Sequence, residues 1–190
     1  MWMLNDDPNE IAKVFKVTLE TQEKDDNWDK YAVRIATTFL NSGNKFGPIS
    51  TSLMKMDNLA QSAHYNESLE ISNNIKSTVL EMKIPHKDPE GLWYYHTGRA
   101  LKGLKQYDEA LKCFQKCISL SKQLVAEKQI VPYSYNSIGE IEMEKGNWTV
   151  ANDSWKKAES YKNFDFERLL SFRLKSNYEI LKSRMKRNSK

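Results

Sequence analysis

Two cysteines four residues apart are the first residues whose type and spacing could support chemistry. Cys113 and Cys117 fall on one face of a strongly helical stretch, where they could form half of a metal site. The three histidines, His64, His86 and His96, show no matching spacing. We therefore favour two small side chains packed along a helix, and we expect free thiols, a reducing compartment and no metal.

A run of carboxylates is the second candidate for chemistry. Glu140, Glu142 and Glu144 suggest acid–base work, but only Glu140 and Glu144 share a helix face, so a solvated helix surface is the favoured interpretation. His96 is interpreted as a packed or rim histidine rather than a catalytic base. The chain has no glycine-rich phosphate loop, metalloprotease motif or nucleophile elbow. We expect no catalytic residue, no cofactor and no enzymatic activity.

The composition narrows the class of protein. A chain of 190 residues with 39% hydrophobic and 28% charged residues is ordinary for one helical globular domain, which argues against collagen-like or disulfide-scaffold proteins. No apolar run approaches the ~18 residues that cross a bilayer. The first residues form neither a signal peptide nor a basic transit peptide. Cytosol, nucleus and membrane surface remain alternative locations.

Helix-breaking residues fall in clusters, and the stretches between them carry apolar residues at steps of three and four. Asp7-Pro8 predicts a helix start, since aspartate caps a helix and proline suits its first turn. Further apolar stripes follow in residues 28–39 and 71–82, and Pro48 opens a short segment through residue 56. No segment alternates with period two, so the predicted class is all-α.

An internal repeat after Pro89 is the most informative pattern. Seven positions recur in kind, with Tyr94, Gly98, Leu101, Tyr107, Ala110, Phe114 and Cys117 matched by Tyr135, Gly139, Glu142, Trp148, Ala151, Trp155 and Ala158. The glycine precedes the alanine by twelve residues in both copies, and the alanine precedes the aromatic residue by four. This is tetratricopeptide spacing, in which the small residues let two antiparallel helices approach and the aromatic side chains fill the gaps.

The predicted fold is a tetratricopeptide-like solenoid of antiparallel helix pairs with a C-terminal capping helix. Its repeats are residues 91–124 and 132–165, and the cap is residues 166–187, all within residues 90–187. Residues 1–84 are expected to be a divergent helical region, the end of an earlier repeat plus linker helices, in a chain that is the C-terminal piece of a longer protein. Met1–Leu4 would then need a cover, for which a second copy of the chain is one candidate.

Two details of the repeat carry structural expectations. Gly98 and Gly139 are 41 residues apart, against 34 for the usual unit, so seven extra residues must lie within 120–131. We expect them to lengthen the second helix of the first unit. Gly103 and Gly146 are expected to end the first helix of each unit in the left-handed conformation.

The concave face of such a solenoid, lined by the first helix of each unit, is the default binding site. By repeat position the candidate groove residues are Tyr95, Arg99, Lys102, Asn136, Glu140 and Met143. This set does not reproduce the Lys/Asn clamp with which some repeats hold a C-terminal carboxylate. It favours an extended or helical peptide of mixed charge, and the alternative is a set of merely exposed polar residues.

The C-terminal helix offers a second binding hypothesis, docking on anionic lipid or RNA. Residues 151–190 hold eleven bases and five acids, and one face carries Arg168, Lys175, Lys182 and Lys186. A solvated tail is the alternative, because cations suit the negative end of a helix dipole. Its Phe, Leu and Tyr side chains are expected to be used in the cap, which leaves no exposed aromatic face for an interfacial anchor.

A narrower resemblance rests on three segments. Residues 92–100, Leu-Trp-Tyr-Tyr-His-Thr-Gly-Arg-Ala, then Pro132-Tyr133 leading to Ile138-Gly139, then residues 161–173 with Phe-Glu-Arg-Leu and Phe-Arg, resemble the C-terminal repeats of the tetratricopeptide repeat protein 39 family. Its fungal members are called inclusion body clearance proteins, also described as mitochondrial outer membrane proteins. The resemblance covers residues 92–173, is faint at residues 30–34, and concerns a family whose members are several times longer.

The resemblance implies a cytoplasmic, non-enzymatic adaptor linked to the clearance of protein inclusions and to lipid droplets, touching the mitochondrial surface. Its partners would be other proteins or peptides, with no specific nucleic acid. It supplies no catalytic residues.

Overall fold

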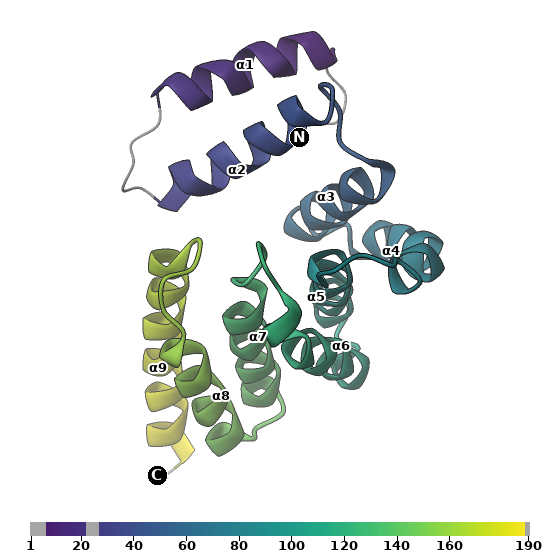
Figure 1. Ribbon diagram of the computed structural model, residues 1–190. Coiled ribbons are helices and arrows are strands. Elements are labelled where there is room, and N and C mark those ends of the chain that lie inside the picture. Colours follow the sequence, from purple (N-terminus) through teal and green to yellow (C-terminus); the bar gives the residue numbers. More distant parts are fainter. Residues whose placement is uncertain (1–6, 22–26, 189–190) are drawn as a thin grey trace.

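The structure is a computed structural model, and it describes residues 7–21 and 27–188. Across these residues the secondary structure is helical and without strands, which confirms the all-α prediction. The elements, shown in Figure 1, are α1 (Pro8–Thr21), α2 (Asn27–Asn41), α3 (Pro48–Gln61), α4 (Tyr65–Leu80), α5 (Asp88–Gly103), α6 (Tyr107–Ser119), the 3₁₀ helix η2 (Ser121–Gln123), α7 (Ile130–Glu144), α8 (Trp148–Ser160) and α9 (Glu167–Asn188).

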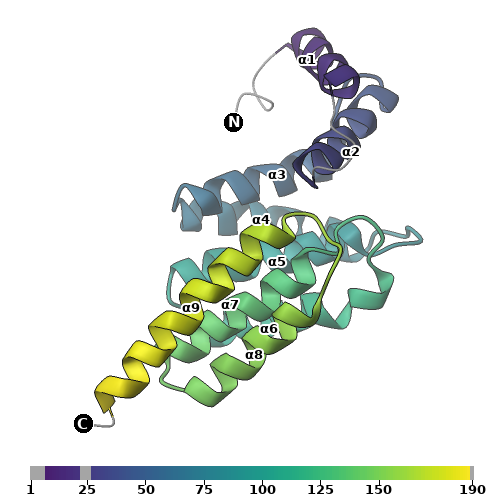
Figure 2. The same cartoon turned by 90° about the vertical axis from the view of Figure 1, so that its left-hand side faces the viewer.

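Three helix pairs stack beside one another, and α9 packs on the last of them. The pairs are α3 with α4, α5 with α6 and α7 with α8, and α5 also contacts α3, α4 and α7. In Figures 1 and 2 the first helices α3, α5, α7 and α9 form an inner, concave row, and α4, α6 and α8 lie outside it. This is the helical solenoid that the repeat predicted.

Close approach within the second and third pairs depends on a glycine that faces an aromatic ring. A Cβ added to Gly98 would lie 2.8 Å from Cε1 of Phe114, and Gly139 faces the indole of Trp155 in the same way. Both aromatic side chains are fully buried, as are Ala110 and Ala151 beside them. The glycines therefore provide the space that the rings fill.

The pair of α3 and α4 repeats this arrangement with the large and small residues exchanged. Tyr65, Tyr107 and Trp148 each begin the second helix of a pair. Nine residues before Tyr65 stands Met56, where the other pairs have glycine, and seven residues after it stands Ser72, where they have an aromatic residue. Both are buried. The end of an earlier repeat plus linker helices was expected in residues 1–84, and α3 and α4 form a further stacked pair within them.

The extra residues between the repeats do not lengthen α6, so that prediction was wrong. The helix ends at Ser119, and η2 and a loop follow. The loop is fixed by the carboxylate of Asp88 at the start of α5, whose Oδ1 accepts backbone N–H groups from Val125 and Glu127, each at 3.0 Å. Three consecutive N–H groups, including that of Ala126, point at this carboxylate, which satisfies loop donors that a longer helix would have used internally.

The turn glycines behave differently from one another. Gly146 has φ +81°, the left-handed conformation that was expected. Gly103 does not, and Lys105 takes this conformation instead, with φ +61°. Gly103 has another role, because the ring of Tyr65 occupies the place of its missing Cβ.

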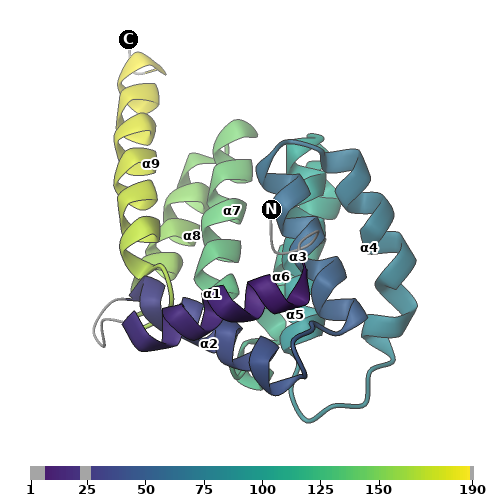
Figure 3. The same ribbon diagram turned by 90° about the horizontal axis from the view of Figure 1, so that it is seen from above.

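Helices α1 and α2 form a hairpin with its own small core. Ile11, Phe15, Ala36 and Phe39 are buried together in it. The predicted cap is confirmed, since the backbone N–H of Asn9 donates to Oδ1 of Asp7 at 2.9 Å. Figure 3 shows the hairpin lying across one end of the stacked helices. Met1–Leu4, for which we expected a cover, lie outside the described residues.

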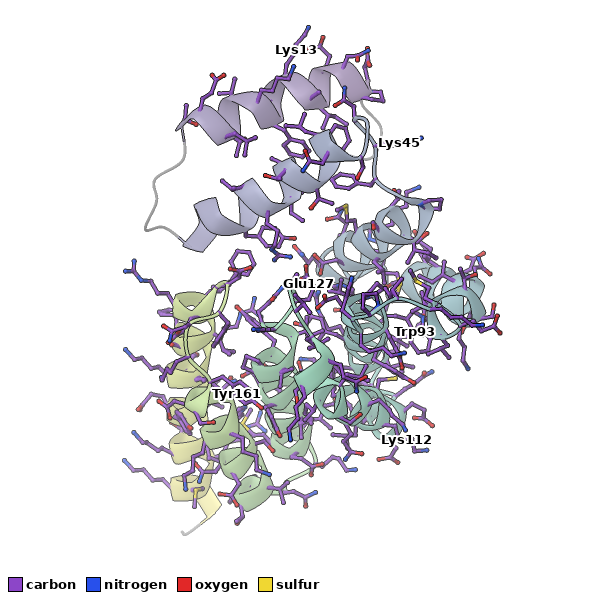
Figure 4. The ribbon with its side chains drawn as sticks, in the orientation of Figure 1. Lys13, Lys45, Trp93, Lys112, Glu127 and Tyr161 are labelled. Atoms are coloured by element: carbon purple, nitrogen blue, oxygen red, sulfur yellow. The ribbon has the colours of Figure 1, made fainter. Side chains whose placement is uncertain are left out.

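One arginine connects this hairpin to the solenoid. Arg34 on α2 donates to Glu127, in the loop before α7, and to Asp165, before α9, the latter at 2.8 Å. Tyr31 packs its ring against Phe166 with 4.9 Å between centroids. Figure 4 labels Glu127 at the end of the solenoid that faces α2.

Candidate functional site

Polar side chains on the concave face pair with one another across successive first helices. Asp57 on α3 forms an ion pair with Arg99 on α5, and Lys102 on α5 forms one with Glu140 on α7. Each of these four side chains is between 22% and 34% exposed, so each still reaches solvent. Two ion pairs thus connect the first helices of the three stacked pairs. In the first pair α5 supplies the base to an acid on α3, and in the second α5 supplies the base to an acid on α7.

The row continues to α9 through two asparagines. Asn136 on α7 donates its Nδ2 to Oε1 of Glu140 at 2.8 Å, and Asn177 on α9 donates to Oδ1 of Asn136 at 3.0 Å. We call the six side chains Asp57, Arg99, Lys102, Glu140, Asn136 and Asn177 the concave ladder. It joins four helices through contacts that are far apart in the sequence.

Both carboxylates of the concave ladder are charged at neutral pH. Burial by itself would raise the pKa of Glu140, but the Lys102 ammonium and hydrogen bonds from Lys102 and Asn136 outweigh it, so the pKa falls below its usual range. Burial opposes the charge of Asp57 as well, and the Arg99 guanidinium contributes to a lowered pKa. The ladder therefore carries two full negative and two full positive charges, which neutralise one another in pairs.

The predicted groove residues divide into accessible and buried ones. The structure brings Arg99, Lys102 and Glu140 together in the concave ladder, half-buried and reachable. Asn136 is only 2% exposed and Met143 only 6%, and Met143 packs in the core shared by α7, α8 and α9. The Tyr95 ring lies under the Arg99 guanidinium at 5.6 Å. Binding of a partner by these residues stays a prediction.

Sequence reasoning missed Asp57 and Asn177. Asp57 escaped because α3 was not recognised as the first helix of a pair, and Asn177 because α9 was considered for its apolar stripe and its bases. The signal was present in principle, since Asp57 directly follows Met56, the residue equivalent to Gly98, as Arg99 follows Gly98 and Glu140 follows Gly139. The residue after the small position therefore faces the concave side in all three pairs.

His96 is buried beside the concave ladder, in agreement with its interpretation as a packed histidine. Its Nδ1 lies 3.5 Å from Oδ1 of Asp57 and makes no hydrogen bond. Burial lowers the pKa of the imidazole to about 4, against the attraction of Asp57 and with a contribution from the Arg99 charge. The histidine is therefore neutral at physiological pH.

The other two clusters that suggested chemistry are structural. Burial raises the pKa of Cys113 to about 11 and that of Cys117 to about 12, which makes both thiols unreactive. Within the described residues no group of three or more His, Cys, Asp and Glu side chains is arranged to hold a metal ion. Glu142 is buried and accepts a hydrogen bond from Nδ2 of Asn147 at 2.6 Å. The solvated-surface interpretation was therefore wrong for Glu142, whereas Glu140 is partly exposed and paired with Lys102.

The last helix differs from expectation in its apolar residues. Leu170, Leu174 and Leu181 are buried against the solenoid, as a cap requires. Phe172, however, is 73% exposed, and Leu169 and Ile180 are about 40% exposed. The expectation that the cap uses all the large apolar side chains of this helix was wrong, because they occupy more than one face of α9. Among the described helices, none is long and apolar enough to cross a membrane.

Comparison with known proteins identifies one of the helix pairs. Residues 91–124, which span almost all of α5 with α6 and η2, match the family model described as the tetratricopeptide repeat. No curated protein and no solved structure matches the chain. The chain therefore contains a tetratricopeptide-type pair within a helical solenoid, and this type of protein is a scaffold for protein–protein interaction. These comparisons do not reach any narrower family.

Proposed function

We propose that this protein is a non-enzymatic adaptor whose concave face binds an extended or helical segment of mixed charge from another protein. The observation that carries the proposal is the concave ladder, in which an acid on α3, two bases on α5 and an acid on α7 follow one another and remain partly exposed. A segment with the complementary order of charges can replace the internal partners of Arg99, Lys102 and Glu140 by its own charges.

The biological setting of this adaptor is proposed from the resemblance over residues 92–173. The proposed setting is the cytoplasm and the surface of the mitochondrial outer membrane, with a role in the clearance of protein inclusions in connection with lipid droplets. The tetratricopeptide match supports the adaptor class and is silent on that setting.

The sharpest test of the concave face is a charge exchange rather than a deletion. Replacing Arg99 by an acid would place two carboxylates beside each other, since Arg99 is paired with Asp57, and would disturb the fold. The double variant Lys102→Glu, Glu140→Lys keeps an ion pair between α5 and α7 but reverses the order of the charges that a ligand meets.

We would compare the proteins captured by the native chain, by the exchange variant and by a control, Lys112→Glu with Lys116→Glu, using quantitative mass spectrometry. The control lysines are exposed on the outer helix α6. We expect partners that are lost from the exchange variant and retained by the control. Equal capture by all three proteins would show that the concave face does not select them.

A further inference from the structure

Helix α9 occupies the place of a first helix, but the described chain has no second helix against it. α3 is covered by α4, α5 by α6 and α7 by α8, whereas α9 makes its main contacts with the preceding pair, α7 and α8. Its inner side packs on α8 and α7 through Leu170, Leu174 and Leu181. The opposite side carries Phe172, which is exposed to solvent. The position of α9 at the end of the row is visible in Figures 1 and 2.

A groove runs between α8 and the C-terminal half of α9. It has a volume of about 730 Å³, and its apolar lining comes from Trp148, Tyr178 and Leu181. Lys175 and Lys182 line it as well. A second hollow of about 470 Å³ lies along the N-terminal half of α9, between Arg168, Phe172 and Lys175. Lys175 lines both, so the two form one continuous surface along the helix.

Bases outnumber acids on this surface, whose lining includes Arg168, Lys175 and Lys182 together with the two acids Glu167 and Glu179. Glu167 is itself paired with Lys162, at 4.0 Å. Lys182 pairs with Glu179 at 2.7 Å, but Arg168, Lys175 and Lys186 form no ion pair with any described residue. On the concave ladder, by contrast, every charge has an internal partner. Unpaired cations beside an apolar groove favour a ligand that brings both carboxylates and an apolar stripe.

We propose that this surface, defined by Trp148, Arg168, Phe172, Lys175, Tyr178 and Lys182 and here called the α9 surface, is a docking site for an acidic amphipathic helix of another protein. The repeat pattern indicates that the ligand is a helix, because every other first helix of the solenoid is covered by a helix. The lysines supply the selectivity. A helix with an apolar stripe on the groove and acids along its edges fits both features.

The geometry favours this partner over the anionic lipid or RNA considered from the sequence. The apolar lining is recessed between two helices, where a flat bilayer does not reach. Phe172 is the one aromatic side chain of α9 that is largely exposed, whereas single-stranded RNA is bound on several stacking aromatic residues. The α9 surface also lies apart from Asn177, which joins the concave ladder, so this proposal does not depend on binding at the concave face.

The test uses the full chain and a labelled synthetic peptide of roughly 18 residues, long enough for several helical turns. The peptide carries leucine and alanine on one face and glutamate along both edges, and a control peptide has lysine in place of each glutamate. We expect the acidic peptide alone to bind, as measured by fluorescence anisotropy. In the protein, Lys175→Glu with Lys182→Glu should weaken binding about tenfold or more.

Two controls separate the α9 surface from the rest of the molecule. The variant Lys112→Glu, Lys116→Glu should bind the acidic peptide like the native chain; Figure 4 labels Lys112 on α6, on the other side of the solenoid from α9. The indole N–H resonance of Trp148 should shift on binding in nuclear magnetic resonance spectra. If the lysine variant fails to fold, Phe172→Ser serves in its place, because that side chain is exposed.

Three results would overturn the proposal. One is equal binding of the acidic peptide by the native chain and the lysine variant. Another is preference for poly(U) RNA or for phosphatidylserine vesicles, which would assign the surface to nucleic acid or lipid. The third is a stable dimer that Phe172→Ser abolishes and that excludes the peptide, which would assign it to a second copy of the chain. None of these results depends on the partners of the concave face.

Discussion

The indole N–H of Trp155 on α8 donates a hydrogen bond to the backbone carbonyl oxygen of Asn136 on α7, with 3.2 Å between the two atoms. The ring reaches this carbonyl because it lies over Gly139, where an added Cβ would be 2.5 Å from Cδ1 of the indole. The N–H of Trp93 makes the same kind of bond to the carbonyl of Ser72, at 3.0 Å. Such bonds satisfy buried tryptophan donors within an apolar core.

The first prediction concerns the glycine below this ring. Gly139→Ala should lower the free energy of unfolding by about 1–3 kcal/mol, because a rigid, fully buried indole cannot move away from the new methyl group. The higher helix propensity of alanine offsets about 1 kcal/mol of this effect. Chemical denaturation measures the difference.

Gly91→Ala is the matched control for this change. A Cβ at Gly91 would meet the ends of the Leu124 and Ile130 side chains, which can rotate away, so we expect a smaller loss of stability. Equal effects at Gly91 and Gly139 would contradict the role assigned to Trp155.

The second prediction tests the exchange of volume in the pair of α3 and α4. Met56→Ala should destabilise the protein by about 2–5 kcal/mol through the cavity that it leaves. Ser72→Leu should destabilise it by about 1–3 kcal/mol by overpacking, and it also removes the 2.7 Å hydrogen bond to Thr97. Because the new leucine can occupy part of the space left by Met56, the double variant should lose less than the sum.

A double-mutant cycle by urea denaturation measures this coupling, which we expect at about 0.5–3 kcal/mol. Strict additivity would mean that the two positions do not share one space. The corresponding residues of the other pairs would then not be equivalent to them.

The same exchange explains what the sequence could and could not predict. The second and third pairs were predicted because Gly98 and Gly139 stand at the small position of the repeat. The first pair was missed because Met56 stands at that position. The large Met56 is matched by the small Ser72 on the second helix, so the pair becomes recognisable only when the side-chain sizes on both helices are compared. The length of the insertion followed from the spacing, but its conformation depends on Asp88, which is 37 residues from Val125. The ion pairs of the concave ladder also join residues far apart in the sequence, so they could not be predicted from local patterns.

The third prediction concerns Arg34. The hairpin of α1 and α2 has its own core, and Arg34 forms two ion pairs with described residues of the solenoid. Arg34→Ala should increase amide hydrogen exchange throughout α2, while the unfolding midpoint of the solenoid changes little.

Arg34→Lys should have an intermediate effect, because lysine keeps the charge but cannot bond two carboxylates with a planar group. Lys45→Ala, in the turn after α2, is the control and should leave the exchange of α2 as it is. Unaltered exchange in Arg34→Ala would show that Tyr31 and its ring contact hold the hairpin without the ion pairs.

The fourth prediction is a dependence of stability on pH. The pKa of His96 is about 4 in the folded protein and about 6.5 in the unfolded chain. The folded state therefore binds fewer protons, so its contribution to stability is complete above pH 6.5 and is lost as the pH falls toward 4. The total loss is about 3 kcal/mol.

His96→Phe should remove most of this dependence, because the Nδ1 atom has no hydrogen bond to lose and the ring is of similar size. Denaturation between pH 7.5 and 5 measures it before the carboxylates of Asp57 and Glu140 begin to titrate. The same slope in both proteins would place the titrating group elsewhere.

The loop that Asp88 fixes has a consequence for how this molecule can change over time. Glu127, in that loop, supplies one of the two carboxylates that hold Arg34, and it belongs to the segment by which this unit exceeds the ordinary repeat length. Shortening the unit to the usual spacing would remove one of the hairpin's attachment points together with the insertion. The insertion and the N-terminal hairpin are therefore structurally coupled, and we expect related chains to gain or lose the two segments together.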